Sequence, residues 1–215
     1  MSITLAVQDL SKKYESFTAL EQTSFTLNTG EITILSGPNG SGKTTLLSCL
    51  SGLIRPSSGT ICVSNYDLFK DEVSARTNLA FVPDVPRFYL ELTAWEHLRF
   101  IAMANQVLDG FESRAESILK MLGLWNMRHH FPHHYSRGMR LKLGLALALI
   151  RPFEVLLLDE PTSALDEESV TVLEDELYKL RSEGASILLS SHDPHLSKRL
   201  GDRHMIIRQG VLTEE

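Results

Sequence analysis

The feature that most restricts the fold of this chain is a glycine-rich turn between two apolar segments. Residues 37–44 read GPNGSGKT and match the pattern GxxxxGK[ST]. Residues 31–36 (EITILS) predict a strand before the turn, and leucines at 46, 47 and 50 predict a helix after it, over residues 43–51. A strand that passes through glycines directly into a helix is typical of an α/β core.

This turn predicts a site for the phosphates of a nucleoside triphosphate. Glycines let the backbone fold tightly so that several N–H groups point inward, and the positive end of the following helix attracts anions. We expect Lys43 to bridge the β- and γ-phosphates and take part in catalysis, and Thr44 to bind Mg²⁺. A coincidental lysine after a glycine-rich turn is the alternative. The residues predicted to bind nucleotide here are Gly37, Pro38, Asn39, Gly40, Ser41, Gly42, Lys43, Thr44 and Thr45.

A second apolar segment predicts the metal-binding side of the same site. Residues 155–158 (VLLL) suit a central parallel strand, and Asp159, Glu160 and Pro161 follow. Neighbouring carboxylates on a strand point to opposite faces, but a proline ends the strand, so both can approach the phosphates. We expect Asp159 to contact Mg²⁺ through water and Glu160 to be the general base. The alternative is an acidic pair that only caps a surface turn.

Strand and helix patterns alternate along the remaining chain and predict an α/β fold with a mainly parallel sheet and a helical insertion. The predicted strands are near residues 3–7, 25–27, 60–64, 155–159, 186–190, 205–207 and 211–212. The predicted helices span residues 94–105, 112–123, 136–150 and 167–182.

Composition limits the partners and the location of the chain. Its 215 residues, 43% hydrophobic and 22% charged, suit one globular domain and exclude a disordered or fibrous protein. The net charge of -6 gives no overall attraction to nucleic acid, so no such partner is expected. The longest apolar run, residues 143–150, is too short for a bilayer, and no signal-peptide pattern opens the chain. Cys49 and Cys62 have no CxxC spacing, which favours the cytoplasm.

Residues 135–139 read YSRGM, residues 163–166 read SALD, and residues 190–193 read SSHD. With the glycine-rich turn and the acidic pair, these motifs stand in an order that resembles the ATP-binding cassette (ABC) family over the whole chain. The resemblance implies that Tyr14 stacks on adenine, that Ser136 and Gly138 bind nucleotide, and that His192 is a catalytic switch histidine that senses the γ-phosphate. From the residues alone, an ordinary surface tyrosine and a structural histidine are the alternatives for Tyr14 and His192.

The same resemblance implies a P-loop NTPase core with a mainly parallel central sheet, an N-terminal antiparallel β subdomain and an inserted helical subdomain. Residues 1–215 would form one ABC ATPase domain, with residues 1–91 and 152–215 as the core and residues 92–151 as the helical subdomain. The function implied is that of an ATP-hydrolysing, Mg²⁺-dependent subunit of an ABC transporter. The VPD and SRGM spellings look most like exporter-type cassettes.

The family arrangement implies two cassettes, identical or different, paired head to tail so that the helix after Ser136 closes over the partner's ATP. Integral membrane permease subunits would supply the transport path and hold the protein at the inner face of the cell membrane. The alternative is a soluble ABC module that acts on ribosomes or DNA. Such proteins usually carry two cassettes or a long coiled coil and a basic surface, and this sequence has none of these.

Three positions, in two motifs, depart from the family pattern. Arg137 and Met139 replace a Gly and the Gln of the usual LSGGQ signature, and Asp84 stands where the family has the Gln of its Q-loop. We expect Asp84 to bind the metal, and its charge beside Glu160 to give a stronger Mg²⁺ dependence than Gln would.

Two other segments carry less specific patterns. Residues 87–92 contain Phe88, Tyr89 and Leu90 and are predicted to face a membrane subunit, with a solvated loop as the alternative. Four histidines lie at positions 129, 130, 133 and 134, and Pro132 interrupts their helical spacing. They favour a polar linker over a metal site.

Overall fold

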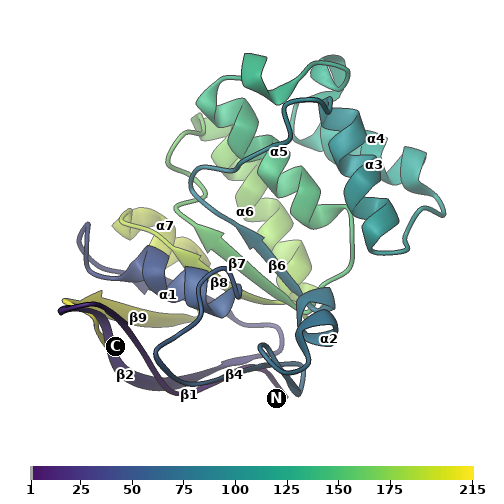
Figure 1. The fold of residues 1–215 in the computed structure, drawn as a ribbon. Coiled ribbons are helices and arrows are strands. Elements are labelled where there is room, and N and C mark those ends of the chain that lie inside the picture. The colour runs from purple at the N-terminus through teal and green to yellow at the C-terminus, as the bar shows by residue number, and fades with distance from the viewer. Residues whose placement is uncertain (1) are drawn as a thin grey trace. The chain divides into compact units, whose positions relative to one another are not determined.

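The computed structural model describes residues 2–215, and Met1 lies outside the described residues. The chain divides into two compact units (Figure 1). Unit 1 comprises Met1–Phe81, Phe153–Glu160 and Glu176–Glu215, and unit 2 comprises Val82–Pro152 and Pro161–Asp175. Over residues 2–215, no helix has the length and apolar character needed to cross a membrane.

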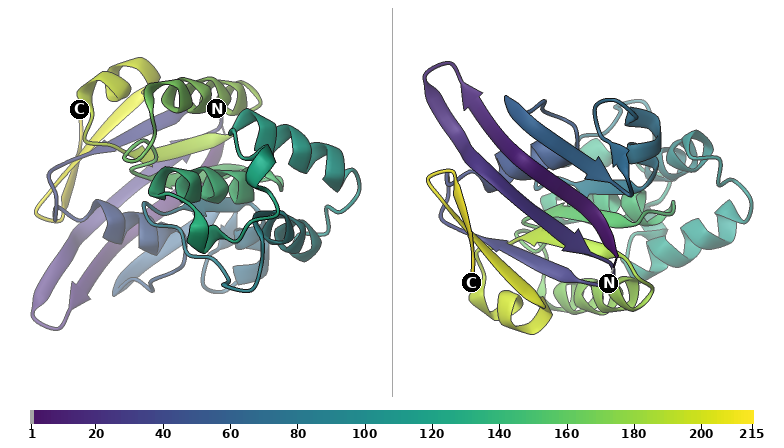
Figure 2. Two further views of the ribbon diagram at one scale, coloured as in Figure 1. Left: turned by 90° about the horizontal axis from the view of Figure 1, so that it is seen from above. Right: turned by 90° about the horizontal axis from the view of Figure 1, so that it is seen from below.

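An antiparallel sheet opens unit 1. Within the described residues its strand order is β2-β1-β4-β5, and Figure 2 shows β1 and β2 as a long hairpin. Its strands are β1 (Ile3–Tyr14), β2 (Phe17–Asn28), β4 (Ser58–Val63) and β5 (Tyr66–Asp67). The long strands carry buried residues toward the core and polar residues outward, which is the pattern of a sheet with one solvated face.

The second sheet of the described chain has the order β10-β9-β3-β8-β7-β6. Its strands are β3 (Ile32–Ser36), β6 (Leu79–Val82), β7 (Val155–Asp159), β8 (Ser186–Ser190), β9 (Arg203–Arg208) and β10 (Val211–Glu214). β3 pairs in parallel with β8 and β9, and β7 pairs in parallel with β8, while β10 is antiparallel to β9. Every residue of β7 and β8 is buried, as expected for central parallel strands.

One hydrophobic core joins the two sheets of unit 1 through α1 (Lys43–Leu50). Leu46, Leu47 and Leu50 on this helix are fully buried among apolar side chains of β1, β2, β3 and β7. The helix that follows the glycine-rich turn is therefore fixed by packing as well as by its hydrogen bonds. α2 (Glu72–Thr77) and α7 (Pro194–Leu200) complete the helices that lie wholly in the described part of unit 1.

Unit 2 is helical. Its elements are α3 (Ala94–Ala104), α4 (Phe111–Met121), the 3₁₀ turns η1 (Trp125–Met127) and η2 (Pro132–His134), α5 (Arg137–Leu149) and the first part of α6 (Glu167–Ser182). α3 begins at a capping box in which the Thr93 hydroxyl accepts the Glu96 N–H and the Glu96 carboxylate accepts the Thr93 N–H.

A partly buried arginine joins the helices of unit 2. Arg114 on α4 donates from Nε to the carbonyl of Ile150 at 3.1 Å and from Nη1 to the carbonyl of Asp109 at 3.1 Å. Its Nη2 also donates to the carbonyl of Val107. One side chain therefore satisfies backbone acceptors beyond the end of α5 and in the loop before α4.

The predicted fold class is confirmed: a mainly parallel sheet, an N-terminal antiparallel sheet and an inserted helical part are all present. The sequence did not predict α2, β5, β6 or α7, because these short elements have too few residues to show a period.

Candidate functional site

The glycine-rich turn lies in unit 1 between β3 and α1, and its backbone has conformations that require glycine. Gly37 has φ 153°, and a Cβ atom there would lie 2.2 Å from the carbonyl oxygen of Ile207. Gly42, the N-cap of α1, has φ 116°, and its Cβ would lie 2.8 Å from the carbonyl oxygen of Ala19. The turn therefore packs closely against neighbouring backbone, and a side chain at either glycine would prevent this conformation.

A buried hydroxyl in this turn is left without a partner. Among the described residues, Ser41 Oγ is a buried side-chain oxygen with no hydrogen bond. The backbone around it is satisfied, since the Ser41 N–H donates to Pro38 and its carbonyl accepts from Gly210. Leaving a buried donor unsatisfied costs about 1–3 kcal/mol, so an anionic ligand that accepts from Ser41 would recover that energy.

Lys43 places a positive charge beside the same turn. Its side chain is buried, and Nζ donates to the carbonyl of Gly37 at 2.7 Å and to that of Pro38 at 3.4 Å. Nζ also lies 3.7 Å from Oε1 of Glu160. A buried ammonium, a glycine-rich turn before a helix and an unpaired hydroxyl are a combination that fits the phosphates of a nucleotide.

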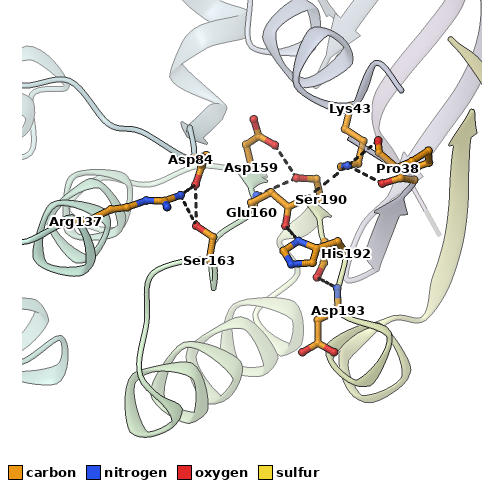
Figure 3. A network of polar contacts seen from close by, with 12 residues as sticks. Pro38, Lys43, Asp84, Arg137, Asp159, Glu160, Ser163, Ser190, His192 and Asp193 are labelled. Carbon is orange, nitrogen blue, oxygen red and sulfur yellow. Dashed lines mark hydrogen bonds and ion pairs between the residues drawn. The ribbon is translucent and has the colours of Figure 1, made fainter. Parts of the chain in front are cut away.

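The carboxylate pair stands where β7 ends. Asp159 is the last residue of β7 and is only 2% exposed, and it lies in register with Ser190 on the neighbouring parallel strand. Figure 3 shows the Ser190 hydroxyl between the two acidic residues. Its Oγ donates to Asp159 Oδ1 at 2.7 Å and accepts from the Glu160 N–H at 2.9 Å.

Ser190 was not predicted as a site residue. Two signals in the sequence could have identified it. Residues 155–159 and 186–190 are both short apolar segments of a parallel sheet, so their carboxyl ends meet at one edge. Ser190 also begins the SSHD segment that ends in His192 and Asp193.

Glu160 has a left-handed backbone conformation and contacts two other predicted catalytic side chains. Its φ is 47°, a left-handed conformation that costs about 1 kcal/mol for a residue with a side chain. The bond to Ser190 helps to hold it there. Its Oε2 lies 2.8 Å from Nδ1 of His192, which is 69% exposed. Unit 1 therefore brings together the three residues predicted to be catalytic, Lys43, Glu160 and His192 (Figure 3).

The predicted metal ligands of unit 1 are compatible with a site completed by phosphate oxygens. Thr44 is an exposed residue in the first turn of α1, and Asp159 supplies a buried carboxylate. Among the side chains that the structure describes, no group of three or more His, Cys, Asp or Glu could hold a metal ion. Mg²⁺ suits such a place, because it commonly takes one or two protein ligands and fills its octahedron with water and phosphate oxygens.

Tyr14, the predicted adenine contact, is the last residue of β1 and lies opposite Phe17 on β2. Both rings are exposed, and the Lys12 ammonium lies 4.7 Å from the centre of the Tyr14 ring. An open aromatic face with a cation on one side can stack on a base.

Unit 2 holds the other predicted site residues. Ser136 caps α5, with its Oγ accepting the Met139 N–H at 3.2 Å. At Gly138, a Cβ would lie 2.5 Å from the carbonyl oxygen of Ala164, so only glycine fits beside the SALD segment. Asp84, predicted to bind metal, accepts at Oδ1 from Arg137 at 2.8 Å and from Ser163 at 2.7 Å.

The histidine-containing linker lies around η2 in unit 2. The rings of His133 and His134 are 4.2 Å apart, and Phe131 stacks on His133 at 5.5 Å. His129 packs 6.3 Å from Trp95.

The fold and the phosphate turn of unit 1 define a P-loop nucleoside triphosphatase with an inserted helical part. Residues 20–163 match the family described as ABC transporter, and the chain belongs to that family. It is accordingly an ABC-type ATP-binding and ATP-hydrolysing subunit.

Similar proteins and structures span nearly the whole chain. YdbJ of Bacillus subtilis, an uncharacterized ABC transporter ATP-binding protein, is 34% identical over 213 residues, 98% of this chain and 68% of that protein. The SkfA peptide export ATP-binding protein SkfE of Bacillus subtilis is 33% identical over 212 residues, 98% of this chain and 88% of that protein.

Two solved structures are also similar to this chain over 98% of its length. The structure of an ATP-binding subunit of an ABC transporter has a TM-score of 0.91 at 33% identity, covering 98% of this chain and 90% of that one. A dimeric ATP-binding cassette in a post-hydrolysis state, bound to ADP and Pi, has a TM-score of 0.90 at 26% identity, covering 98% and 97%.

Proposed function

We propose that this chain binds ATP with Mg²⁺ in unit 1, hydrolyses it within a dimer of cassettes, and powers export through separately encoded membrane subunits. The observation that carries the proposal is the contact of Glu160 with both Lys43 and His192 beside a phosphate turn that contains an unpaired buried hydroxyl. These groups supply the charge, the donors and the base that phosphoryl transfer to water requires.

The phosphate turn would hold the nucleotide. Residues 37–45 wrap the phosphates with backbone N–H groups, Ser41 donates its free hydroxyl, and Lys43 turns from the backbone carbonyls toward the β- and γ-phosphates. Tyr14 would stack on the adenine ring, which its exposed face permits.

Glu160 would act as the general base. It accepts a proton from the attacking water as the new oxygen–phosphorus bond forms and the bond to the β-phosphate oxygen breaks, releasing ADP. Thr44 and Asp159 would hold Mg²⁺, which neutralises charge on the phosphate oxygens. Ser190 keeps Asp159 in place by its 2.7 Å bond.

His192 would report the state of the γ-phosphate. Its Nδ1 is already bound to Glu160, and the exposed ring leaves Nε2 open to a ligand. A phosphate oxygen in contact with that nitrogen would hold the ring, and its loss after hydrolysis would release it.

A second cassette would complete each site. We propose that Ser136 and Gly138 of one cassette bind the ATP of the other, and that residues 92–151 work as the helical subdomain carrying them. The dimeric cassette bound to ADP and Pi, 26% identical to this chain, supports the pairing. A metal role for Asp84 stays a prediction, because its Oδ1 is engaged by Arg137 and Ser163.

An apolar patch in unit 2 would dock the membrane subunits on the cytoplasmic side. Tyr89 and Leu90 are exposed, Leu90 by 67%, and the Tyr89 ring packs edge-on against Phe100 at 5.7 Å. Val85 and Met103 are also exposed apolar residues of this unit. The contact of Tyr89 with Phe100 brings exposed apolar side chains together, and such a cluster favours a partner interface. SkfE, a peptide export protein 33% identical to this chain, supports export as the direction.

The decisive experiment has two measurements. One is the rate of phosphate release from ATP by the purified protein, and the other is the amount of the protein in the membrane fraction of the cells that produce it. We expect Lys43→Ala and Glu160→Gln to abolish Mg²⁺-dependent turnover, and Lys179→Ala, an exposed lysine paired with Glu176, to leave it unchanged. Leu90→Asp should release the protein from membranes without loss of ATP binding. Hydrolysis at the parental rate by Glu160→Gln would contradict the base assignment. Stimulation by ribosomes or nucleic acid, with no membrane association, would contradict the transport role.

A further inference from the structure

Three segments of unit 2 are joined by one small polar network. Nη2 of Arg137, the first residue of α5, donates to Asp84 Oδ1 at 2.8 Å and to Ser163 Oγ at 3.1 Å. The Ser163 hydroxyl donates to the same carboxylate oxygen at 2.7 Å. Figure 3 shows the three side chains converging from the loop after β6, the start of α5 and the SALD segment.

The side chains of this network are too exposed for their hydrogen bonds to contribute much to the stability of the fold. The Arg137 side chain is 54% exposed and the Asp84 side chain 35% exposed. Ion pairs between such exposed groups contribute far less to the free energy of folding than the buried core does. A ligand with more negative charge than one carboxylate can therefore displace Asp84 from the guanidinium.

The position of Arg137 identifies that ligand. It directly follows Ser136, which we propose to contact the terminal phosphate of the partner's ATP. A guanidinium presents a planar fork of donors that matches phosphate oxygens, and it stays charged at all relevant pH values. Glycine at this position, as in the usual signature, could make no such side-chain contact.

We propose that Arg137 is a nucleotide-binding residue that exchanges Asp84 for the terminal phosphate of the ATP held by the facing cassette. The inference rests on the proposed dimer of cassettes. Asp84 is then a competing anion that holds the guanidinium in the nucleotide-free chain. When Arg137 leaves, Ser163 loses one of its two bonds, so phosphate binding is coupled to the SALD segment within the same unit.

The test measures ATP-dependent dimerisation by analytical ultracentrifugation, with hydrolysis blocked by Glu160→Gln in every sample. Adding Arg137→Ala should weaken the dimer at least about tenfold, since hydrogen bonds between a guanidinium and a phosphate are charge-assisted and strong. Adding Asp84→Asn should tighten the dimer, because it removes the competing charge. With Arg137→Ala also present, Asp84→Asn should have no further effect.

The matched control is Arg140→Ala, which removes a positive charge one turn later on α5. It should dimerise like Glu160→Gln alone. If it weakens the dimer as much as Arg137→Ala, the effect is one of net charge and the inference is wrong. The inference is also wrong if Arg137→Ala has no effect on dimerisation, or if Asp84→Asn weakens the dimer. Either result would mean that the Arg137–Asp84 ion pair does not compete with phosphate binding. Failure of Glu160→Gln itself to dimerise with ATP, even with a second cassette from the same transporter supplied, would instead refute the proposed function.

Discussion

The hydroxyl of Ser190 lies 2.7 Å from Oδ1 of Asp159, and one residue farther along the chain the N–H of Glu160 donates to the same Ser190 oxygen. A neutral side chain on β8 therefore fixes both acidic residues at the end of β7. Asp159 is almost completely buried, so this bond also offsets part of the cost of burying its charge.

Replacing Ser190 by alanine should damage catalysis and stability together. We expect Ser190→Ala to lower the free energy of unfolding by about 2 kcal/mol, because it removes a hydrogen bond to a buried carboxylate. The turnover number should fall at least about tenfold as Asp159 and Glu160 lose their common partner.

Ser186→Ala is the matched control, since Ser186 is a fully buried, hydrogen-bonded serine at the other end of β8. It should lower stability and leave the turnover number unchanged. If both variants reduce turnover equally, Ser190 does no more than stabilise the strand.

Gly37→Ala should weaken ATP binding. Its new methyl group would lie 2.2 Å from the Ile207 carbonyl oxygen and 2.9 Å from Ser41 Oγ, so the turn must shift. We expect the dissociation constant for ATP, measured by fluorescence titration, to rise at least about tenfold. Gly123→Ala, at a glycine with φ 69° and open space around it, should leave ATP binding unchanged. Tight binding by Gly37→Ala would contradict the proposed use of this turn.

The central fold could be predicted because short sequence motifs indicate which strands and helices must flank them. The turn at residues 37–44 requires a strand before it and a helix after it, and β3 and α1 have these places. The partners of individual side chains could not be predicted, because they depend on which strands lie side by side. Ser190 meets Asp159 only through the parallel register of β7 and β8.

Asp84 illustrates the same limit in unit 2. Its position in the family pattern predicts a metal ligand, and this stays a prediction, but nothing in the sequence predicted that its Oδ1 accepts from Arg137 and Ser163. The three residues are far apart in sequence, and no local period connects them. Two departures from the family pattern, one negative and one positive, are paired in space, and this relationship appears only once the helices are packed.

Arg114→Ala should destabilise unit 2. The guanidinium donates to the carbonyls of Ile150, Asp109 and Val107, and each lost bond costs about 0.5–1.5 kcal/mol. We expect the free energy of unfolding to fall by about 2–3 kcal/mol in urea denaturation. Lys120→Ala, which removes an exposed ion pair with Glu116, should change it by less than about 1 kcal/mol. A change no larger for Arg114→Ala would show that these bonds contribute little.

Stability should fall in mild acid because of His97. Burial lowers the pKa of His97 below its usual 6.5, outweighing the Thr93 carbonyl and Glu96, which raise it. The Tyr89 N–H donates to the unprotonated Nε2, while Nδ1 contacts the Thr93 carbonyl. As the pH falls through 6.5, the unfolded chain binds a proton that the folded chain does not, so the free energy of unfolding decreases.

The measurement is urea denaturation of the parental chain and of His97→Gln at several pH values between about 7.5 and 5.5. One titrating group contributes a slope of at most about 1.4 kcal/mol per pH unit. His97→Gln cannot titrate, so we expect the parental chain to lose more stability over this range. Equal losses in the two proteins would mean that His97 is not responsible.

The central claim is that ATP held by one cassette is enclosed by the Ser136 helix of a second. Its most direct test is the mass of Glu160→Gln in solution by light scattering, with ATP and Mg²⁺, with ADP and Mg²⁺, and without nucleotide. We predict a dimer with ATP alone, or with ATP and a second cassette from the same transporter, and a monomer in the other conditions. A monomer in every condition, despite measurable ATP binding and with such a partner supplied, would contradict the account.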